Sequence, residues 1–166
     1  FLAEVYFESG QYQKATDHYT KAVALFDRYG NWPSTTIVSK IGLVRAKAMS
    51  SGGDINIKTL YGYVSENKTK LYEGWIRRYV AEALFNIDEE KLLEAEDWIR
   101  TAIAADEKNR VLFELGRDYL VHAAILKRKG DRSKSKDNLN KSIEIFKECG
   151  AYGWVEKVEE KFASLS

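Results

Sequence analysis

Hydrophobic residues recur along this chain at the three- and four-residue steps of a helix face. The first clear stripe consists of Tyr12, Ala15, Tyr19, Ala22 and Phe26. Such steps place side chains on one side of a helix, so the stripe predicts a helix over residues 11–29. A shorter helical pattern precedes it, and Gly10 supplies the turn that separates the two. The chain therefore begins with a predicted helical hairpin, residues 1–9 and 11–29.

The same periodicity predicts helices along the whole chain. They span residues 1–9, 11–29, 35–49, 54–67, 69–86, 89–105, 109–129, 132–149 and 152–165. Pro33 and Ser34 suit a helix entry, and Asp54 suits an N-cap, because the first turn of a helix leaves backbone N–H groups unpaired. Gly150 ends a helix in the same way as Gly30. The chain is therefore predicted to be all-α.

The helical pattern repeats with a step of about 40 residues. Small side chains recur at this step at Ala22, Gly62, Ala102 and Ser142, and larger or intermediate ones at Tyr19, Thr59, Ile99 and Leu139. Small side chains let neighbouring helices approach closely, and larger ones fill the space between them. The step divides the chain into helix pairs at about residues 1–30, 34–67, 69–106 and 109–149, with a closing helix at 152–165.

The order of aromatic, glycine and small residues resembles the tetratricopeptide repeat. The residues that carry the resemblance are Tyr6, Gly10, Tyr12, Ala15, Tyr19 and Ala22, and again Gly130, Leu139, Ser142 and Ile145. The usual unit of that family has about 34 residues, and a step near 40 also fits HEAT or armadillo arrays. Gly52, where Tyr12 would be, and Gly62 within a helix predict that the second pair is the loosest.

The resemblance to the tetratricopeptide repeat implies one domain over residues 1–166. This domain would be a right-handed α-solenoid of about four helix pairs plus the closing helix. Phe1 lies inside a helical pattern without a cap or a leader, so we expect the chain to be a piece of a longer protein.

A second resemblance covers much of residues 70–165. The run Ile145-Phe146-Lys147-Glu148-Cys149-Gly150-Ala151, followed by Trp154, is similar to the helical-repeat tails of large bacterial signalling proteins. In those proteins an ATPase or cyclase domain, or a transcription activator of the maltose-regulator type, precedes the array. The resemblance implies a bacterial, cytoplasmic protein in which the array is a regulatory domain.

The composition argues against several classes of function. The 26 basic and 25 acidic residues leave a net charge of +1, which favours neither nucleic acid nor a membrane surface. The single cysteine, Cys149, cannot form an internal disulfide, which fits a reducing cytoplasm. No apolar run approaches the roughly 20 residues that span a bilayer.

Catalytic and metal-binding patterns are missing from the sequence. His18 and His122 are the only histidines and fall at unrelated positions of the repeat, so we expect a surface residue and a core residue. Cys149 has no histidine at helical spacing, so we expect it to be a small packing residue rather than a nucleophile. No Cys or His pair has zinc spacing. The glycines at 52–53 lack the lysine of a phosphate-binding loop. We therefore expect no enzyme activity, no cofactor and no metal.

Binding of a protein or peptide is the function that the resemblance implies. In tetratricopeptide arrays the first helix of each pair lines the inner wall, where extended or helical peptides bind. The family register, carried over to helices 35–49, 69–86 and 109–129, predicts a wall of bases and aliphatic residues. Its members are Lys40, Val44, Lys47, Arg77, Val80, Leu84, Arg117, Leu120, Ala124 and Lys127.

Such a wall suits an acidic or amphipathic peptide, because bases guide association and aliphatic contacts supply affinity. Bases that merely keep a groove soluble are the alternative. The corresponding positions include Glu4, Lys40 and Val44 rather than a Lys–Asn pair, which argues against a clamp for chaperone tails.

Three further hypotheses stay open. The array can act as a sensor arm that holds an ATPase, cyclase or transcription-regulator domain of the same polypeptide. The basic cluster at residues 127–141 can contact phosphate or nucleic acid, although no aromatic residues interleave it for base stacking and a solvated turn is the simpler interpretation. Leu2, Val5 and Tyr6, which the truncated first helix would leave uncovered, predict an end-to-end homodimer.

Overall fold

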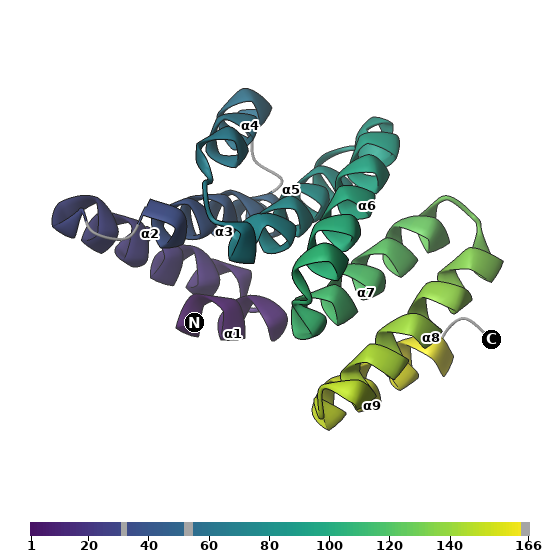
Figure 1. Cartoon of the computed structure of the whole chain (residues 1–166). Helices are drawn as coiled ribbons and strands as arrows, with labels where there is room; N and C mark the ends of the chain where they lie inside the picture. Colours follow the sequence, from purple (N-terminus) through teal and green to yellow (C-terminus); the bar gives the residue numbers. More distant parts are fainter. Residues whose placement is uncertain (31–32, 52–54, 164–166) are drawn as a thin grey trace.

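The computed structural model describes residues 1–30, 33–51 and 55–163, and its regular elements in these ranges are all helical (Figure 1). They are α1 (Leu2–Glu8), α2 (Tyr12–Tyr29), α3 (Pro33–Ser51), α4 (Ile57–Glu66), η1 (Lys70–Tyr72), α5 (Glu73–Ile87), η2 (Glu89–Lys91), α6 (Leu92–Asn109), α7 (Leu112–Arg128), α8 (Arg132–Glu148) and α9 (Tyr152–Ala163). The predicted all-α class is confirmed. The last predicted residues of the closing helix, 164–165, lie outside the described residues.

The helices pack side by side along the chain and form a helical solenoid (Figure 1). The most extensive contacts join α7 with α8, α5 with α6, and α2 with α3, and α6 with α7, α1 with α2, and α8 with α9 also pack together. Helix α5 also contacts α3 and α7, so it lies at the centre of the array. The main core gathers around it and includes the fully buried Ile41, Leu60, Tyr79 and Ile99.

The turns at Gly10 and Gly130 share one backbone geometry. Gly10 and Gly130 have φ angles of 75° and 84°, in the left-handed region that glycine adopts without strain. At each turn two backbone N–H groups bond back to the preceding helix, as in Gln11 N to Tyr6 O at 2.9 Å. These bonds satisfy carbonyls at the helix end and allow the next helix to fold back.

The end of α6 has this left-handed geometry without a glycine. Arg110 takes a φ of 56° and closes α6 with the same backbone bonds, including Val111 N to Asp106 O at 3.0 Å. Helix α6 therefore continues to Asn109, and the prediction that this helix ends at residue 105 was wrong. A residue other than glycine in the left-handed region gives no composition signal, which explains the error.

The second pair is the least regular part of the array. Helix α4 is short and has few contacts with α3 and α5, and Figure 1 shows it projecting from the array. Its N-cap is Asn56, whose side chain accepts a hydrogen bond from Thr59 N at 3.1 Å. Asp54, the predicted N-cap, lies outside the described residues. A Cβ atom at Gly62 would meet nothing within 4 Å, so close packing does not require the small residue there.

Close helix approach occurs at three other glycines, Gly42, Gly74 and Gly116, and two of them face aromatic rings. A Cβ atom at Gly42 would lie 2.6 Å from the Tyr19 ring, and one at Gly116 would lie 2.7 Å from the Phe146 ring. Both rings are buried, so they have little room to move. Glycine at these two positions lets α2 approach α3, and α8 approach α7.

A buried pair of carboxyl groups links α6 to α7. Asp118 accepts a hydrogen bond from the buried Arg78 at 3.0 Å, and the buried carboxyl group of Asp106 interacts with that of Asp118. Burial raises the pKa of Asp106 to about 6, although the charge of Arg78 opposes this rise. Burial also raises the pKa of Asp118. One of the two carboxyl groups is therefore neutral in mildly acidic solution.

The glycine contacts predict opposite effects of the same substitution. Gly116→Ala should lower the free energy of unfolding by about 1–3 kcal/mol, because the new methyl group overlaps the Phe146 ring. Gly62→Ala should instead stabilise α4 by about 0.5–1 kcal/mol, because alanine loses less backbone entropy than glycine in an open helical position. Urea unfolding measures the first effect, and hydrogen exchange of the α4 amides measures the second. A Gly116→Ala variant as stable as the parent chain would contradict the described packing.

The carboxyl pair predicts a loss of stability as pH rises. The folded chain holds the Asp106 proton more tightly than the unfolded chain, so this group stabilises the fold at low pH and loses that contribution between about pH 4 and pH 7. Asp106→Asn should flatten this part of the profile of unfolding free energy against pH. Asp137→Asn, on the exposed side of α8, is the matched control and should leave the profile unchanged. An Asp106→Asn profile identical to that of the parent chain would count against the raised pKa.

Candidate functional site

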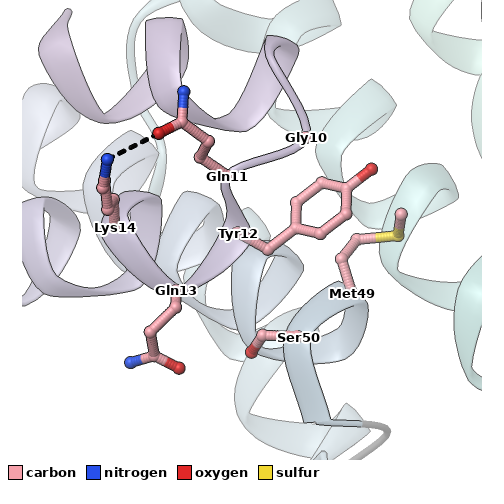
Figure 2. Close-up of a pocket in the computed structure, with 7 residues that line it drawn as sticks. All are labelled: Gly10, Gln11, Tyr12, Gln13, Lys14, Met49 and Ser50. Atoms are coloured by element: carbon pink, nitrogen blue, oxygen red, sulfur yellow. Dashed lines mark hydrogen bonds between the residues drawn. The ribbon is translucent and has the colours of Figure 1, made fainter.

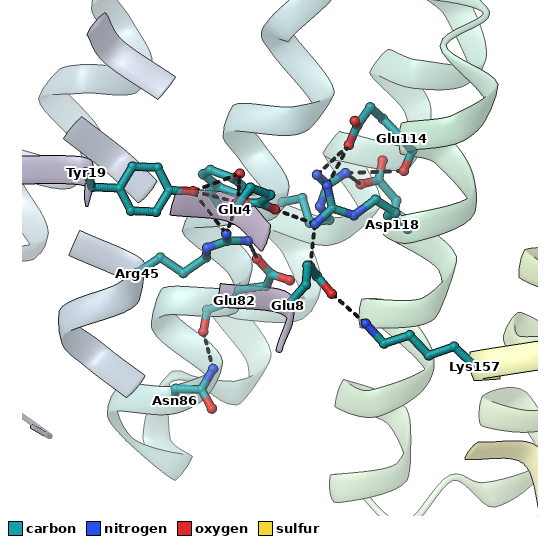
Figure 3. Close-up of polar contacts among 12 residues, drawn as sticks. Glu4, Glu8, Tyr19, Arg45, Glu82, Asn86, Glu114, Asp118 and Lys157 are labelled. Carbon is teal, nitrogen blue, oxygen red and sulfur yellow. Dashed lines mark hydrogen bonds and ion pairs between the residues drawn. The ribbon is translucent and has the colours of Figure 1, made fainter. Parts of the chain in front are cut away.

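The side chain of Arg45 lies at the centre of a buried ionic cluster. It is fully buried on α3, and its guanidinium stacks between the rings of Phe7 and Tyr79, 3.6 Å from each centroid. It donates hydrogen bonds to the carboxylates of Glu4, at 2.5 Å, and Glu82 (Figure 3). Helices α1, α3 and α5 are joined at this one guanidinium.

The carboxylate of Glu4 is the acceptor that most of the cluster shares. It accepts from Arg45, from Arg117 at 2.5 Å, from Tyr19 at 2.5 Å and from Tyr79. Burial acts to raise the pKa of Glu4, but the charges of Arg45 and Arg117 outweigh burial and hold that pKa far below its usual value. Glu4 is therefore ionised at neutral pH, and it connects α1 to α2, α3, α5 and α7.

A second carboxylate on α1 reaches the far end of the array. Glu8 accepts from Arg117 Nη2 on α7 at 2.5 Å and from Lys157 Nζ on α9 at 2.7 Å (Figure 3). The Lys157 ammonium also lies 4.3 Å from the centroid of the Trp154 ring. We call the contacts of Glu8 with Arg117 and Lys157 the Glu8 bridge. The bridge joins residues that are more than 100 positions apart in the sequence.

A pocket of about 430 Å³ lies beside the Glu8 bridge, on the inner face formed by the first helices of the pairs. We call it the inner groove. Its lining residues are Phe7, Glu8, Gly10, Tyr12, Met49, Glu82, Phe85, Asn86, Arg117, Leu120, Val121, Ala124, Trp154, Lys157 and Lys161. The groove therefore combines aromatic and aliphatic walls from α5 and α7 with bases from α7 and α9.

A second hollow of about 410 Å³ adjoins the groove at the start of α2 (Figure 2). Its lining residues are Gly10, Gln11, Tyr12, Gln13, Lys14, Met49 and Ser50. Tyr12 and Met49 lie next to each other and border both spaces. Lys14 Nζ donates to Gln11 Oε1 at 2.7 Å on the rim. The hollow extends the inner face beyond the groove toward the end of α3.

The structure brings three of the predicted wall residues to the groove. Arg117, Leu120 and Ala124 lie on one face of α7 and line it. Ala124 is exposed, whereas Arg117 is only 5% exposed and is held by Glu4 and Glu8. A peptide-binding role for these residues stays a prediction.

The other predicted wall residues lie elsewhere. Val80 and Leu84 are fully buried in the core, and Val44 packs against it, because α5 is enclosed by α3, α6 and α7. Arg77 points toward α6 and donates to Thr101 O at 3.1 Å.

The lysines of the predicted wall do not line the groove either. Lys40 on α3 pairs with Asp27 of α2 at 3.0 Å. Lys47 and Lys127 are exposed on α3 and α7 outside the groove. A register taken from shorter repeats therefore did not transfer to α3 and α5.

Sequence reasoning missed the contributions of the first and last helices. Glu4 and Glu8 are four residues apart on α1, which places two acids on one face of an otherwise apolar helix. Trp154, Lys157 and Lys161 are three and four residues apart on α9, which also places them on one helix face, and they line the groove together. That spacing is the signal that could have identified these residues. Their shared location depends on the curvature of the array, which no local pattern encodes.

The histidines and the cysteine show no catalytic arrangement. His122 is partly buried 3.8 Å from Glu96, and burial lowers its pKa, so the ring is neutral at neutral pH. His18 stacks on Tyr6 with ring centroids 5.0 Å apart. Cys149 is exposed, contrary to the expected packing role. Within residues 1–30, 33–51 and 55–163 no three His, Cys, Asp or Glu side chains are grouped in a way that suits a metal ion.

Several bases of the 127–141 cluster are engaged within the chain. Lys129 pairs with Glu96, and Lys134 pairs with Asp131 at 2.8 Å. Arg128 donates to Phe85 O at 2.6 Å. These contacts favour the interpretation of the cluster as a turn between two helices.

The apolar end predicted for self-association is exposed. Leu2 and Val5 on α1 are 52% and 62% exposed. Tyr6 instead packs on the small core of α1 and α2. End-to-end association through this surface stays a prediction.

The comparisons with known proteins point to a helical repeat. A tetratricopeptide-repeat family model matches residues 1–27, and this match supports a helical repeat protein of that type. The comparisons with curated proteins and with solved structures found no match to this chain. No helix in the described part of the chain is both long enough and apolar enough to cross a membrane. Similarity to bacterial signalling tails stays a prediction.

The ionic cluster predicts a strong effect of removing one charge. Glu4→Gln should lower the free energy of unfolding by about 3 kcal/mol, because it leaves the buried Arg45 and Arg117 with one carboxylate fewer. Glu159→Gln, on the exposed side of α9, is the control and should change stability by less than about 0.5 kcal/mol. The lowered pKa of Glu4 means that this contribution is full above its usual pKa of 4.5 and is lost only as pH falls through the lowered value. Urea unfolding at neutral pH makes the comparison, and equal effects of the two variants would contradict the role given to Glu4.

Proposed function

We propose that this chain is a protein-binding module that holds an amphipathic peptide segment of a partner in the inner groove. The observation that supports the proposal is the composition of the groove wall. Phe85, Val121, Ala124 and Trp154 present apolar surface beside the ammonium of Lys157. Apolar side chains of a bound segment would fill the groove, and the bases would fix its orientation.

The groove suits the binding of side chains from a peptide segment better than the catalysis of a reaction. Four ionisable residues that line it, Glu8, Glu82, Arg117 and Lys157, are engaged in ion pairs of the fold. A catalytic acid or base would need freedom to exchange protons with a substrate. Helical repeats of this type commonly act as non-catalytic interaction scaffolds, which agrees with this proposal.

The sensor-arm hypothesis uses the same groove with a different source of the bound segment. In the scaffold version the segment belongs to another protein, and in the sensor version it belongs to another domain of the same polypeptide. Both versions need a segment with apolar side chains at helical or extended spacing. A test of the groove itself therefore applies to both.

The proposal predicts that a charge placed in the groove blocks peptide capture. A library of random phage-displayed peptides selected on the immobilised chain should yield binders, and Ala124→Glu should weaken them by at least about tenfold. Ala124 is exposed on α7, so the substitution adds a carboxylate to the groove without disturbing the core. Ala104→Glu is the matched control, because Ala104 is exposed on α6 outside the groove. Selection of no peptide, or equal effects of both substitutions, would overturn the proposal.

A further inference from the structure

We propose that Glu8 is an internal ligand of the inner groove, and that an acidic side chain of the bound segment replaces it on Lys157. This inference rests on the proposed function, because it names the chemistry of the segment that the same groove accepts. It assigns α1 a regulatory part in binding in addition to its part in the fold.

The geometry of the Glu8 bridge resembles that of a bound ligand. One Glu8 oxygen accepts from Arg117 at 2.5 Å, and the other accepts from Lys157 at 2.7 Å. Helix α1 packs along α2, and it contacts α7 and α9 through these side-chain pairs and the Glu4–Arg117 pair. The carboxylate of Glu8, on α1, therefore binds the bases that α7 and α9 present to the groove.

The two bases differ in how readily they can change partner. Arg117 is nearly inaccessible and keeps Glu4 and Glu114 as further partners. The Lys157 side chain is 35% exposed, and Glu8 is the carboxylate with which it pairs in the described structure. The contact with the Trp154 ring would hold the Lys157 ammonium at the groove after Glu8 leaves. Lys157 is therefore the exchangeable base.

The charges of the groove select an acidic segment. Its bases are Arg117, Lys157 and Lys161, and its carboxylates are Glu8 and Glu82, of which Glu82 is bound by the buried Arg45. Displacement of Glu8 would leave the bases of α7 and α9 in excess at the groove. A carboxylate from the bound segment restores the balance, whereas a base in that segment would be repelled.

Replacement of Glu8 on Lys157 by another carboxylate costs less free energy than leaving Lys157 without a partner. Burial acts to raise the pKa of Glu8, but the charges of Arg117 and Lys157 lower it overall, so Glu8 is ionised and competes at neutral pH. A partly exposed ion pair contributes little to stability, because water screens its charges. A ligand carboxylate can therefore take over Lys157 at small cost, while apolar contacts in the groove supply the affinity. The apparent affinity of the groove for an acidic segment is thus its intrinsic affinity multiplied by the fraction of molecules in which Glu8 has left Lys157.

The test uses a fluorescein-labelled synthetic helical peptide that carries leucine on one face and glutamate beside it. A second peptide has glutamine in place of each glutamate. Anisotropy titrations compare the parent chain with Glu8→Gln, which keeps the shape of the side chain and removes its charge. Glu144→Gln is the control, because Glu144 is exposed on α8 outside the groove. Thermal melts of each variant check that it is folded.

Glu8→Gln should tighten binding of the acidic peptide by at least about fivefold and leave the glutamine peptide unchanged. Lys157→Gln should weaken the acidic peptide by a similar factor, and Glu144→Gln should have no effect. Glu8→Asp, which keeps the charge on a shorter side chain, should lie between the parent chain and Glu8→Gln. It also provides the comparison if Glu8→Gln does not fold.

Equal binding of the two peptides, failure of both to bind, or no gain in Glu8→Gln would overturn the inference about Glu8. The proposed function is judged separately, by whether the phage selection yields peptides that Ala124→Glu blocks. Selected peptides without acidic residues would contradict the role of Glu8 and leave the groove as a binding site. The two proposals therefore fail on different results.

Discussion

The ionised carboxylate of Glu4 holds together helices from most of the chain. A helix as short as α1 is marginal in water by itself, so its position depends on tertiary contacts. Glu4 supplies these contacts by accepting from Arg45, Arg117, Tyr19 and Tyr79 at one point. Burial of charges is costly unless the partners are complete, and here each charge of the cluster has an opposite partner. The arrangement of the inner face follows from keeping this cluster complete.

This cluster makes the array less modular than an ordinary solenoid. Repeats usually contact their neighbours alone, so their stability is close to a sum of local terms. Here Glu4 pairs with Arg117 of α7 and Glu8 pairs with Lys157 of α9, so α1 is linked directly to the fourth helix pair and to the closing helix. Helix α4 contributes little to these links and projects from the array (Figure 1). The ends of the array are therefore coupled to each other more directly than to α4.

The same short helix connects the stability of the fold with access to the groove. Glu4 faces the buried arginines, and Glu8, one turn further along α1, faces the groove and Lys157. The proposed exchange at Lys157 leaves Glu4 in place, so the core persists while one side-chain link opens. This division of roles follows from burial, because Arg45 cannot change partner without exposing a charge to the core, whereas Lys157 already contacts solvent.

Local sequence patterns predict the helices, most of their turns and the all-α class. Helical spacing and glycine at turns such as Gly10 and Gly130 are local properties, which a linear pattern records. The sequence also placed Arg117, Leu120 and Ala124 on one face of α7. Tertiary structure alone decided which faces meet across the array. Val80 and Leu84 became core because α5 is enclosed on several sides, and Glu8 met Lys157 because the array curves until its ends approach. Curvature arises from many small packing rotations, and no single residue encodes it.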